Sequence, residues 1–120
     1  MTLYHVSYDA KESSDSKALR LDIPAALLKA ERSVAALTEP VRSTFRFKAE
    51  SGDEPRARIL TAMAGFADRC YYFLSESDSY VRDGKVFYPS KTMANEELDK
   101  EFQKLLKARL EDSAGEDGND

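Results

Sequence analysis

The chain has 120 residues, of which 42% are hydrophobic and 33% charged, with one cysteine and one histidine. This length allows a single domain, and six tyrosines with six phenylalanines can fill a small core. Cys70 and His5 supply too few ligands for a structural zinc site, a single cysteine excludes an internal disulfide, and the small number of such residues argues against a conventional Ser-His-Asp or Cys-His-Asp hydrolase. No run approaches the ~20 apolar residues that span a bilayer and no secretory signal is visible, so we expect a cytoplasmic protein without membrane contact.

The formal net charge of -4 is unevenly distributed along the chain. Residues 111–120 contain five acidic side chains and no basic one, which leaves 17 acidic against 18 basic side chains in residues 1–110. We therefore expect one domain over residues 1–110 and an acidic, disordered tail over 111–120. A near-neutral body excludes a strongly positive DNA-coating protein and still permits a local basic face. The tail serves solubility by default, and screening that face or competing for a partner's cationic site are alternatives.

The first third of the chain predicts a strand and a helix. Residues 2–9 alternate between apolar and polar side chains, as in a half-buried strand. The polar residues 10–22 predict a loop. Pro24 suits a first helical turn, and leucines and valine recur after it at helical spacing, so we expect a helix over 24–37. Pro40 ends this helix because the residue before a proline avoids helical geometry.

The middle of the chain predicts two more strands, a helix and a hairpin. Residues 42–49 alternate again, with one apolar and one basic face. Residues 51–55 form a turn and helix start, and the helix ends near Cys70. The aromatic run 71–75 is short and predicts a strand buried on both faces. Asp83-Gly84 between two short apolar runs is a strong hairpin signal.

Residues 96–110 predict an amphipathic helix with a single apolar stripe. The order of elements indicates an α+β sandwich, in which helices cover one face of a mixed or antiparallel sheet and an amphipathic helix is added at the C-terminus. The stripe consists of Leu98, Phe102, Leu105, Leu106 and Leu110.

Two strand sequences carry a resemblance to a known family. The first, residues 4–9 (YHVSYD), ends in an aspartate, and the second, residues 42–47 (RSTFRF), contains a Ser-Thr-aromatic sequence. With the aromatic strand 71–74, they resemble the small ferredoxin-like CRISPR-associated adaptation nucleases and their SinR-like relatives over residues 2–75. The resemblance implies a homodimer of ferredoxin-like folds. It further implies that Asp9 and its symmetry mate bind a divalent metal such as Mg²⁺ for phosphodiester hydrolysis, or that the dimer is a catalytically silent scaffold for duplex DNA.

Asp9 also has a chemical rationale of its own as a catalytic and metal-binding residue. Mg²⁺ is commonly held by one or two carboxylates with water and phosphate oxygens, and Ser7 or Asp15 would supply a second ligand. The alternative is that Asp9 ends its strand by accepting hydrogen bonds from nearby backbone amides. His5 lies too far along the strand from Asp9, at ~13 Å, to share a reacting atom. Cys70 is either a thiol activated by its basic neighbour or a small buried group.

The basic face of residues 42–49 is the clearest binding signal. Arg42, Arg46 and Lys48 lie on one face of the strand, whose positions are ~6.6–7 Å apart with Thr44 between the two arginines, and would track phosphates, with Arg56 and Arg58 extending the patch. The alternative is an ordinary solvated strand face, on which charges also prevent aggregation. Aromatic side chains in the strands would either stack on bases or fill the core.

Two functional hypotheses follow. The first is a small nucleic-acid-associated protein of a mobile-element or defence system, either a metal-dependent nuclease or a silent dimeric scaffold. The second is a non-enzymatic protein-interaction module, such as an antitoxin or a phage- or plasmid-encoded inhibitor, which acts through the helix 96–110 and an exposed sheet edge. The first requires nucleic acid and a homodimer, and the second requires a protein partner.

Overall fold

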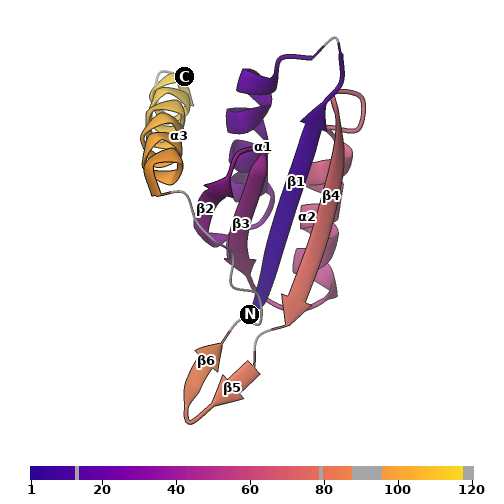
Figure 1. Cartoon of the computed structure of the whole chain (residues 1–120), viewed down its shortest axis with the longest axis vertical. Helices are drawn as coiled ribbons and strands as arrows, with labels where there is room; N and C mark the ends of the chain where they lie inside the picture. The colour runs from indigo at the N-terminus through magenta and orange to yellow at the C-terminus, as the bar shows by residue number, and fades with distance from the viewer. Residues whose placement is uncertain (13, 79, 88–95, 118–120) are drawn as a thin grey trace.

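The computed structural model describes residues 1–12, 14–78, 80–87 and 96–117 (Figure 1). Four strands form an antiparallel sheet in the order β2-β3-β1-β4, and β5 with β6 forms a separate two-stranded sheet. The predicted α+β class is confirmed, and the sheet is antiparallel. The elements are β1 (Thr2–Ala10), α1 (Ser16–Ala30), β2 (Ala35–Val41), β3 (Thr44–Ala49), α2 (Asp53–Ala64), β4 (Cys70–Asp78), β5 (Tyr80–Arg82), β6 (Lys85–Phe87) and α3 (Glu96–Asp117).

The alternation in β1 divides the sheet into two faces. Tyr4 pairs with Phe47 and Val6 with Phe45 across the β1–β3 ladder, and all four side chains are buried. The rings of Tyr4 and Phe47 stack with their centroids 5.2 Å apart. Side chains two residues apart on a strand share a face, so these four side chains form one continuous apolar surface.

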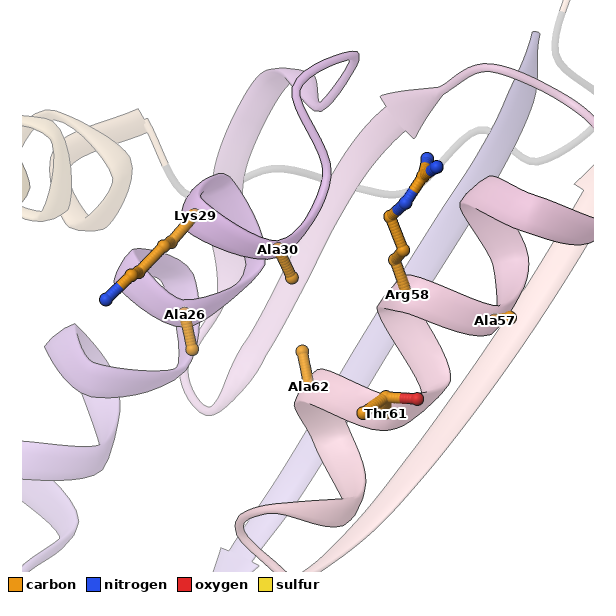
Figure 2. Close-up of a pocket in the computed structure, with 7 residues that line it drawn as sticks. All are labelled: Ala26, Lys29, Ala30, Ala57, Arg58, Thr61 and Ala62. Carbon is orange, nitrogen blue, oxygen red and sulfur yellow. The ribbon is translucent and has the colours of Figure 1, made fainter.

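Helices α1 and α2 bury their apolar stripes against that surface, and their side chains join the same hydrophobic cluster. Figure 2 shows the two helices side by side in front of the strands. Each fully buried aliphatic side chain contributes roughly 1.5–3 kcal/mol to stability. The helical members of the cluster with no exposed area are Leu19, Ile23 and Leu27 of α1 and Ile59 and Met63 of α2.

Helix α3 lies along the edge strand β2, on the side of the sheet opposite β4 (Figure 1). Phe102 is fully buried with its ring centroid 5.4 Å from that of Phe45. The Gln103 side chain donates to the Leu37 carbonyl at 2.6 Å, and the Asp99 carboxylate accepts from the Glu39 backbone amide at 2.9 Å. The helix therefore satisfies backbone groups of β2 that no further strand pairs.

The loop expected over residues 10–22 and the helix expected over 24–37 are wrong in their boundaries. Helix α1 begins at Ser16, because the Asp15 carboxylate caps it by accepting from the amides of Lys17 and Ala18 at 2.9 and 3.3 Å. Pro24 lies inside the helix rather than in its first turn. The helix ends at Ala30, and residues 35–41 form β2, which the helical spacing of apolar residues concealed.

Three further boundaries differ from the expectation. Residue 43 has a φ of 64° and belongs to a turn, so β3 starts at Thr44 rather than at residue 42. Helix α2 follows Gly52, whose φ of 130° disfavours other residues, and it ends at Ala64 well before Cys70. Helix α3 continues to Asp117, so the backbone of 111–117 is helical where disorder was expected, and residues 118–120 lie outside the described part.

The hairpin expected at Asp83-Gly84 is confirmed. Both residues have positive φ values, 52° and 72°, as a two-residue turn between twisted antiparallel strands requires. Strands β5 and β6 pair on either side of the turn, with Arg82 opposite Lys85.

Candidate functional site

The sheet face opposite the hydrophobic cluster consists mainly of polar, basic and exposed aromatic side chains. None of its members belongs to the cluster that the described helices share. We call it the open face. The ladders place its side chains in three rows, which are His5–Arg46–Ser75, Ser7–Thr44–Phe73 and Asp9–Tyr71, with Lys48 one step beyond the first row.

The positive charge of the open face comes from β3. Arg46 and Lys48 are two residues apart and separated by ~6.6–7 Å along the strand. Within the described part of the chain, Arg46 makes no ion pair. Five other arginines bind carboxylates, namely Arg20, Arg56, Arg58, Arg69 and Arg109.

His5 lies beside Arg46 and adds no charge at neutral pH. Burial of the imidazole, and then the positive charge of Arg46, lower the pKa of His5 below its ordinary value of 6.5. The histidine becomes a third cation of the open face only when the pH falls or when an anion binds nearby.

The other predicted phosphate-binding arginines lie elsewhere. Arg42 lies in the turn after β2 and lines a hollow of ≈ 390 Å³ with Tyr8 and Glu101. Arg56 and Arg58 lie on α2, where they pair with Glu76 at 3.0 Å and Glu31 at 2.7 Å. The structure therefore brings Arg46 and Lys48 together on one surface and does not bring the other three onto it.

Asp9 lies near the end of β1, exposed and opposite Tyr71. Its two proposed co-ligands are otherwise engaged, since the Ser7 hydroxyl is 3.0 Å from that of Thr44 and Asp15 caps α1. Among the described residues, no three His, Cys, Asp or Glu side chains are grouped to hold a metal ion. Asp9 is thus not part of a ligand cluster among the described residues, and a Mg²⁺ site at Asp9 stays a prediction.

Sequence reasoning missed the exposure of the aromatic residues of β4. Tyr71 and Phe73, expected to be buried on both faces of the sheet, are 67% and 69% exposed. The signal was present in the second half of the strand, where residues 75–78 (SESD) are all polar and so argue against burial on both faces. The amine of Lys11 lies 5.0 Å from the centroid of the Tyr71 ring.

Of the two alternatives for Cys70, an activated thiol or a small buried side chain, the structure shows the second. It is 2% exposed, and its thiol donates to the Phe66 carbonyl at 3.5 Å. Burial raises the pKa of the Cys70 thiol, although Arg69 and Lys11 act in the opposite direction. The protonated thiol is a poor nucleophile, which argues against a catalytic cysteine.

A buried charge network was not expected from the sequence. The Arg20 guanidinium donates to Glu39 at 2.8 Å and to Glu101 at 2.9 Å. Glu39 has no exposed area, and its Oε1 atom has no hydrogen-bond partner among the described residues. Burial raises the pKa of Glu39, and Arg20 opposes that shift. The network fastens α3 to α1 and β2, so its role is structural.

A hollow of ≈ 550 Å³ separates α1 from α2 (Figure 2). The methyl groups of Ala26, Ala30 and Ala62 point into the gap, whereas the Lys29 amine points away from it. The Arg58 guanidinium at its rim is already paired with Glu31 and Glu54. This hollow therefore lacks the convergent polar groups that orient a ligand.

None of the helices in the described ranges is both long and apolar enough to cross a membrane. No family model matches the chain, and neither a curated protein nor a solved structure matches it at a significant score.

Proposed function

We propose that this chain is a small nucleic-acid-binding protein that contacts phosphates through the open face. The observation that carries the proposal is the pair Arg46 and Lys48, which lie two residues apart on β3, away from the helices. Arg46 forms no ion pair within the described residues, whereas five other arginines are each paired with a carboxylate. A guanidinium without a carboxylate partner remains available to bind a phosphate with two hydrogen bonds.

The charge balance of the open face supports the same ligand class. Among the described residues in its rows, the only carboxylate is that of Asp9, which lies in the row farthest from Lys48. Each phosphate that a cation neutralises releases counterions from the nucleic acid, so even two contacts add affinity that falls as salt rises. A neutral sugar or an acidic protein surface with few charges would gain less from this arrangement.

We also infer that the fold is the ferredoxin-like arrangement implied by the resemblance. The element order β1-α1-β2-β3-α2-β4 and the strand order β2-β3-β1-β4 support this inference, because they make two interleaved βαβ units. In this arrangement α1 and α2 form the helical layer, the open face is the second surface of the sheet, and α3 is an addition at the β2 edge. Membership of a defence or mobile-element system would follow from the resemblance alone.

Binding of a fluorescent oligonucleotide at several salt concentrations tests the proposed function. The double variant Arg46→Ala/Lys48→Ala should weaken binding and reduce the slope of log K against log salt by about 1.4 to 1.8, the value for two lost phosphate contacts. Arg32→Ala is the matched control, because Arg32 is exposed and forms no ion pair among the described residues but lies outside the open face. Equal affinity and slope for the double variant and the wild type would exclude this site.

The nuclease version of the proposal depends on Asp9. If two subunits place their Asp9 carboxylates together, Mg²⁺ would support cleavage of a phosphodiester and EDTA would stop it. Asp9→Asn should then abolish cleavage while leaving the unfolding transition unchanged, since Asp9 is exposed. Cleavage that persists in this variant would place the activity elsewhere, and binding without cleavage would leave a silent scaffold.

A second candidate function, protein interaction, is favoured by the edge strand β4. Helix α3 covers the β2 edge, whereas no described element pairs with the outer edge of β4. An unpaired strand edge is a template for another strand. The helix route to a partner is less favourable, because Leu98, Phe102 and Leu106 are buried within this chain. Light scattering combined with size-exclusion chromatography reports whether this edge pairs two copies into a homodimer.

A further inference from the structure

Two aromatic rings protrude from the open face at one end of the sheet. Tyr71 and Phe73 are the most exposed large hydrophobic side chains in the described part of the chain, at 67% and 69%. They are two residues apart on β4, which places them ~6.6–7 Å apart on the same side of the strand. Tyr72, between them, points to the other face and is 37% exposed.

The residues beside Phe73 are too small to cover its ring. The register places Phe73 beside Ser7, whose hydroxyl is hydrogen-bonded to that of Thr44, and Ser75 follows on the same face. Serine and threonine side chains reach little beyond the backbone, so the faces of the ring above them stay accessible. Exposed aromatic rings add little to stability and promote aggregation, and their presence on a soluble surface indicates a contact with another molecule.

The surroundings of the rings favour an anionic ligand with flat, apolar parts. Arg46 lies in the row adjacent to Phe73, two strands away, and strands are ~4.8 Å apart. The Lys11 amine lies 5.0 Å from the Tyr71 ring and donates to the Ala67 carbonyl at 2.7 Å. Arg46 and Lys11 therefore lie on either side of the pair of rings, and the Asp9 carboxylate lies in the same row as Tyr71, so the phosphates are expected on the Arg46 side.

We propose that the open face binds single-stranded nucleic acid, with unpaired bases stacked on Tyr71 and Phe73 and the backbone phosphates on Arg46 and Lys48. This inference rests on the proposed function and specifies its ligand. In a duplex the base faces are already stacked on one another, so only the phosphates would reach this surface. In a single strand every base presents a free face to an aromatic ring, whatever its sequence.

The test compares one labelled oligothymidylate of about 12 nucleotides with the same strand annealed to oligoadenylate, by fluorescence anisotropy at fixed salt. Wild-type protein should bind the single strand more tightly than the duplex. Phe73→Ala and Tyr71→Ala should each weaken single-strand binding by about 5- to 150-fold and leave duplex binding unchanged. Both side chains are mostly exposed, so their removal should leave the melting temperature unchanged, and thermal unfolding measures this.

Two control variants separate stacking from general apolar contact. Phe73→Tyr keeps the ring and should retain wild-type affinity, whereas Phe73→Leu keeps apolar volume without a π-face and should behave as Phe73→Ala. Leu60→Ala removes an exposed apolar side chain of α2, 48% exposed, and should change neither affinity.

The outcomes distinguish this inference from the proposed function. If Arg46→Ala/Lys48→Ala weakens both ligands while Tyr71→Ala and Phe73→Ala change neither, the phosphate site stands and the stacking inference is overturned. If the protein binds neither oligonucleotide at low salt, both are overturned. If Phe73→Ala changes only the mass measured by light scattering, the rings belong to an interface between copies, and the inference is likewise overturned.

Discussion

Aromatic residues lie on both faces of this sheet, and the two sets have opposite environments. Tyr4 and Phe47 stack beneath the helices, with 1% and 0% of their surface exposed, whereas Tyr71 and Phe73 are mostly exposed on the other side. The first pair removes apolar area from water and holds the fold together. The second pair contributes little to stability and offers its ring faces to another molecule. Residue type alone therefore does not assign an aromatic strand residue to core or to binding.

The largest expected effect separates the two faces directly. Phe47→Ala should lower the free energy of unfolding by about 3–5 kcal/mol, because it leaves a cavity next to the Tyr4 ring. Phe73→Ala should change it by no more than about 0.5 kcal/mol. Urea unfolding followed by circular dichroism measures both. A loss of several kcal/mol for Phe73→Ala would show that the open face is covered, and the comparison would fail.

The next effect tests how far the buried face depends on charge. Arg20→Ala should cost about 3 kcal/mol, because it leaves the Glu39 carboxylate buried without its cation. The double variant Arg20→Leu/Glu39→Leu removes both charges and should recover much of the loss. If the double variant is as unstable as Arg20→Ala, the loss does not come from an unpaired buried charge, and the hydrogen bonds from Arg20 to its partners are what hold α3 in place. The measurement is again urea unfolding.

A smaller effect concerns the stability in acid that Asp22 of α1 gives to the fold. Burial alone would raise the pKa of Asp22, but Arg69 at 2.9 Å and Arg109 at 2.8 Å outweigh it and hold the pKa below the ordinary value of 3.8. The ionised carboxylate therefore stabilises the fold above pH 3.8, and this contribution is lost as the pH falls through the lower folded-state pKa.

Asp22→Asn should accordingly cost about 1–2 kcal/mol at pH 7. The unfolding free energies of variant and wild type should converge as the pH is lowered below 3.8. A difference that stays constant down to pH 2 would show that the variant acts through packing, not through charge.

The smallest expected effect concerns the open face and His5. In the protein without a ligand the pKa of His5 lies below 6.5, and a phosphate bound nearby would raise this pKa. The complex therefore takes up a proton, and affinity rises as the pH falls. The gain should be about 1.5- to 5-fold, the size of one partly exposed ion pair. His5→Gln should remove this pH dependence of oligonucleotide binding. An unchanged dependence would place the titrating group elsewhere.

The sequence predicted those elements whose local pattern agrees with their tertiary environment. The alternation in residues 2–9 and 44–49 follows from one buried and one open face, and Asp83-Gly84 determines its turn by backbone preference alone. Strand β2 was missed because its pattern reflects tertiary contacts. Glu39 is buried only because Arg20, nineteen residues earlier, supplies its counter-charge.

The candidate site was predicted in part for a similar reason. Arg46 and Lys48 were placed correctly on one face because period two is local. The exposure of Phe73 depends on β4 being an edge strand of the sheet, and strand order is not encoded in a five-residue aromatic run. Arg42 was assigned to the basic face by the same alternation, which the positive φ at Ser43 interrupts.

The position of α3 at the β2 edge has a consequence for synthesis of the chain. The helix follows the four sheet strands in the chain and leaves the ribosome after them, so the outer edge of β2 and one side of Phe45 stay uncovered until Phe102 has emerged. A domain grows from its N-terminus at ~5–20 residues per second, which gives this nascent sheet a brief period with two open edges. Ribosomes that stall while residues from 96 onward are still inside the exit tunnel would hold the chain in that state, the one most prone to pair with a neighbouring nascent chain.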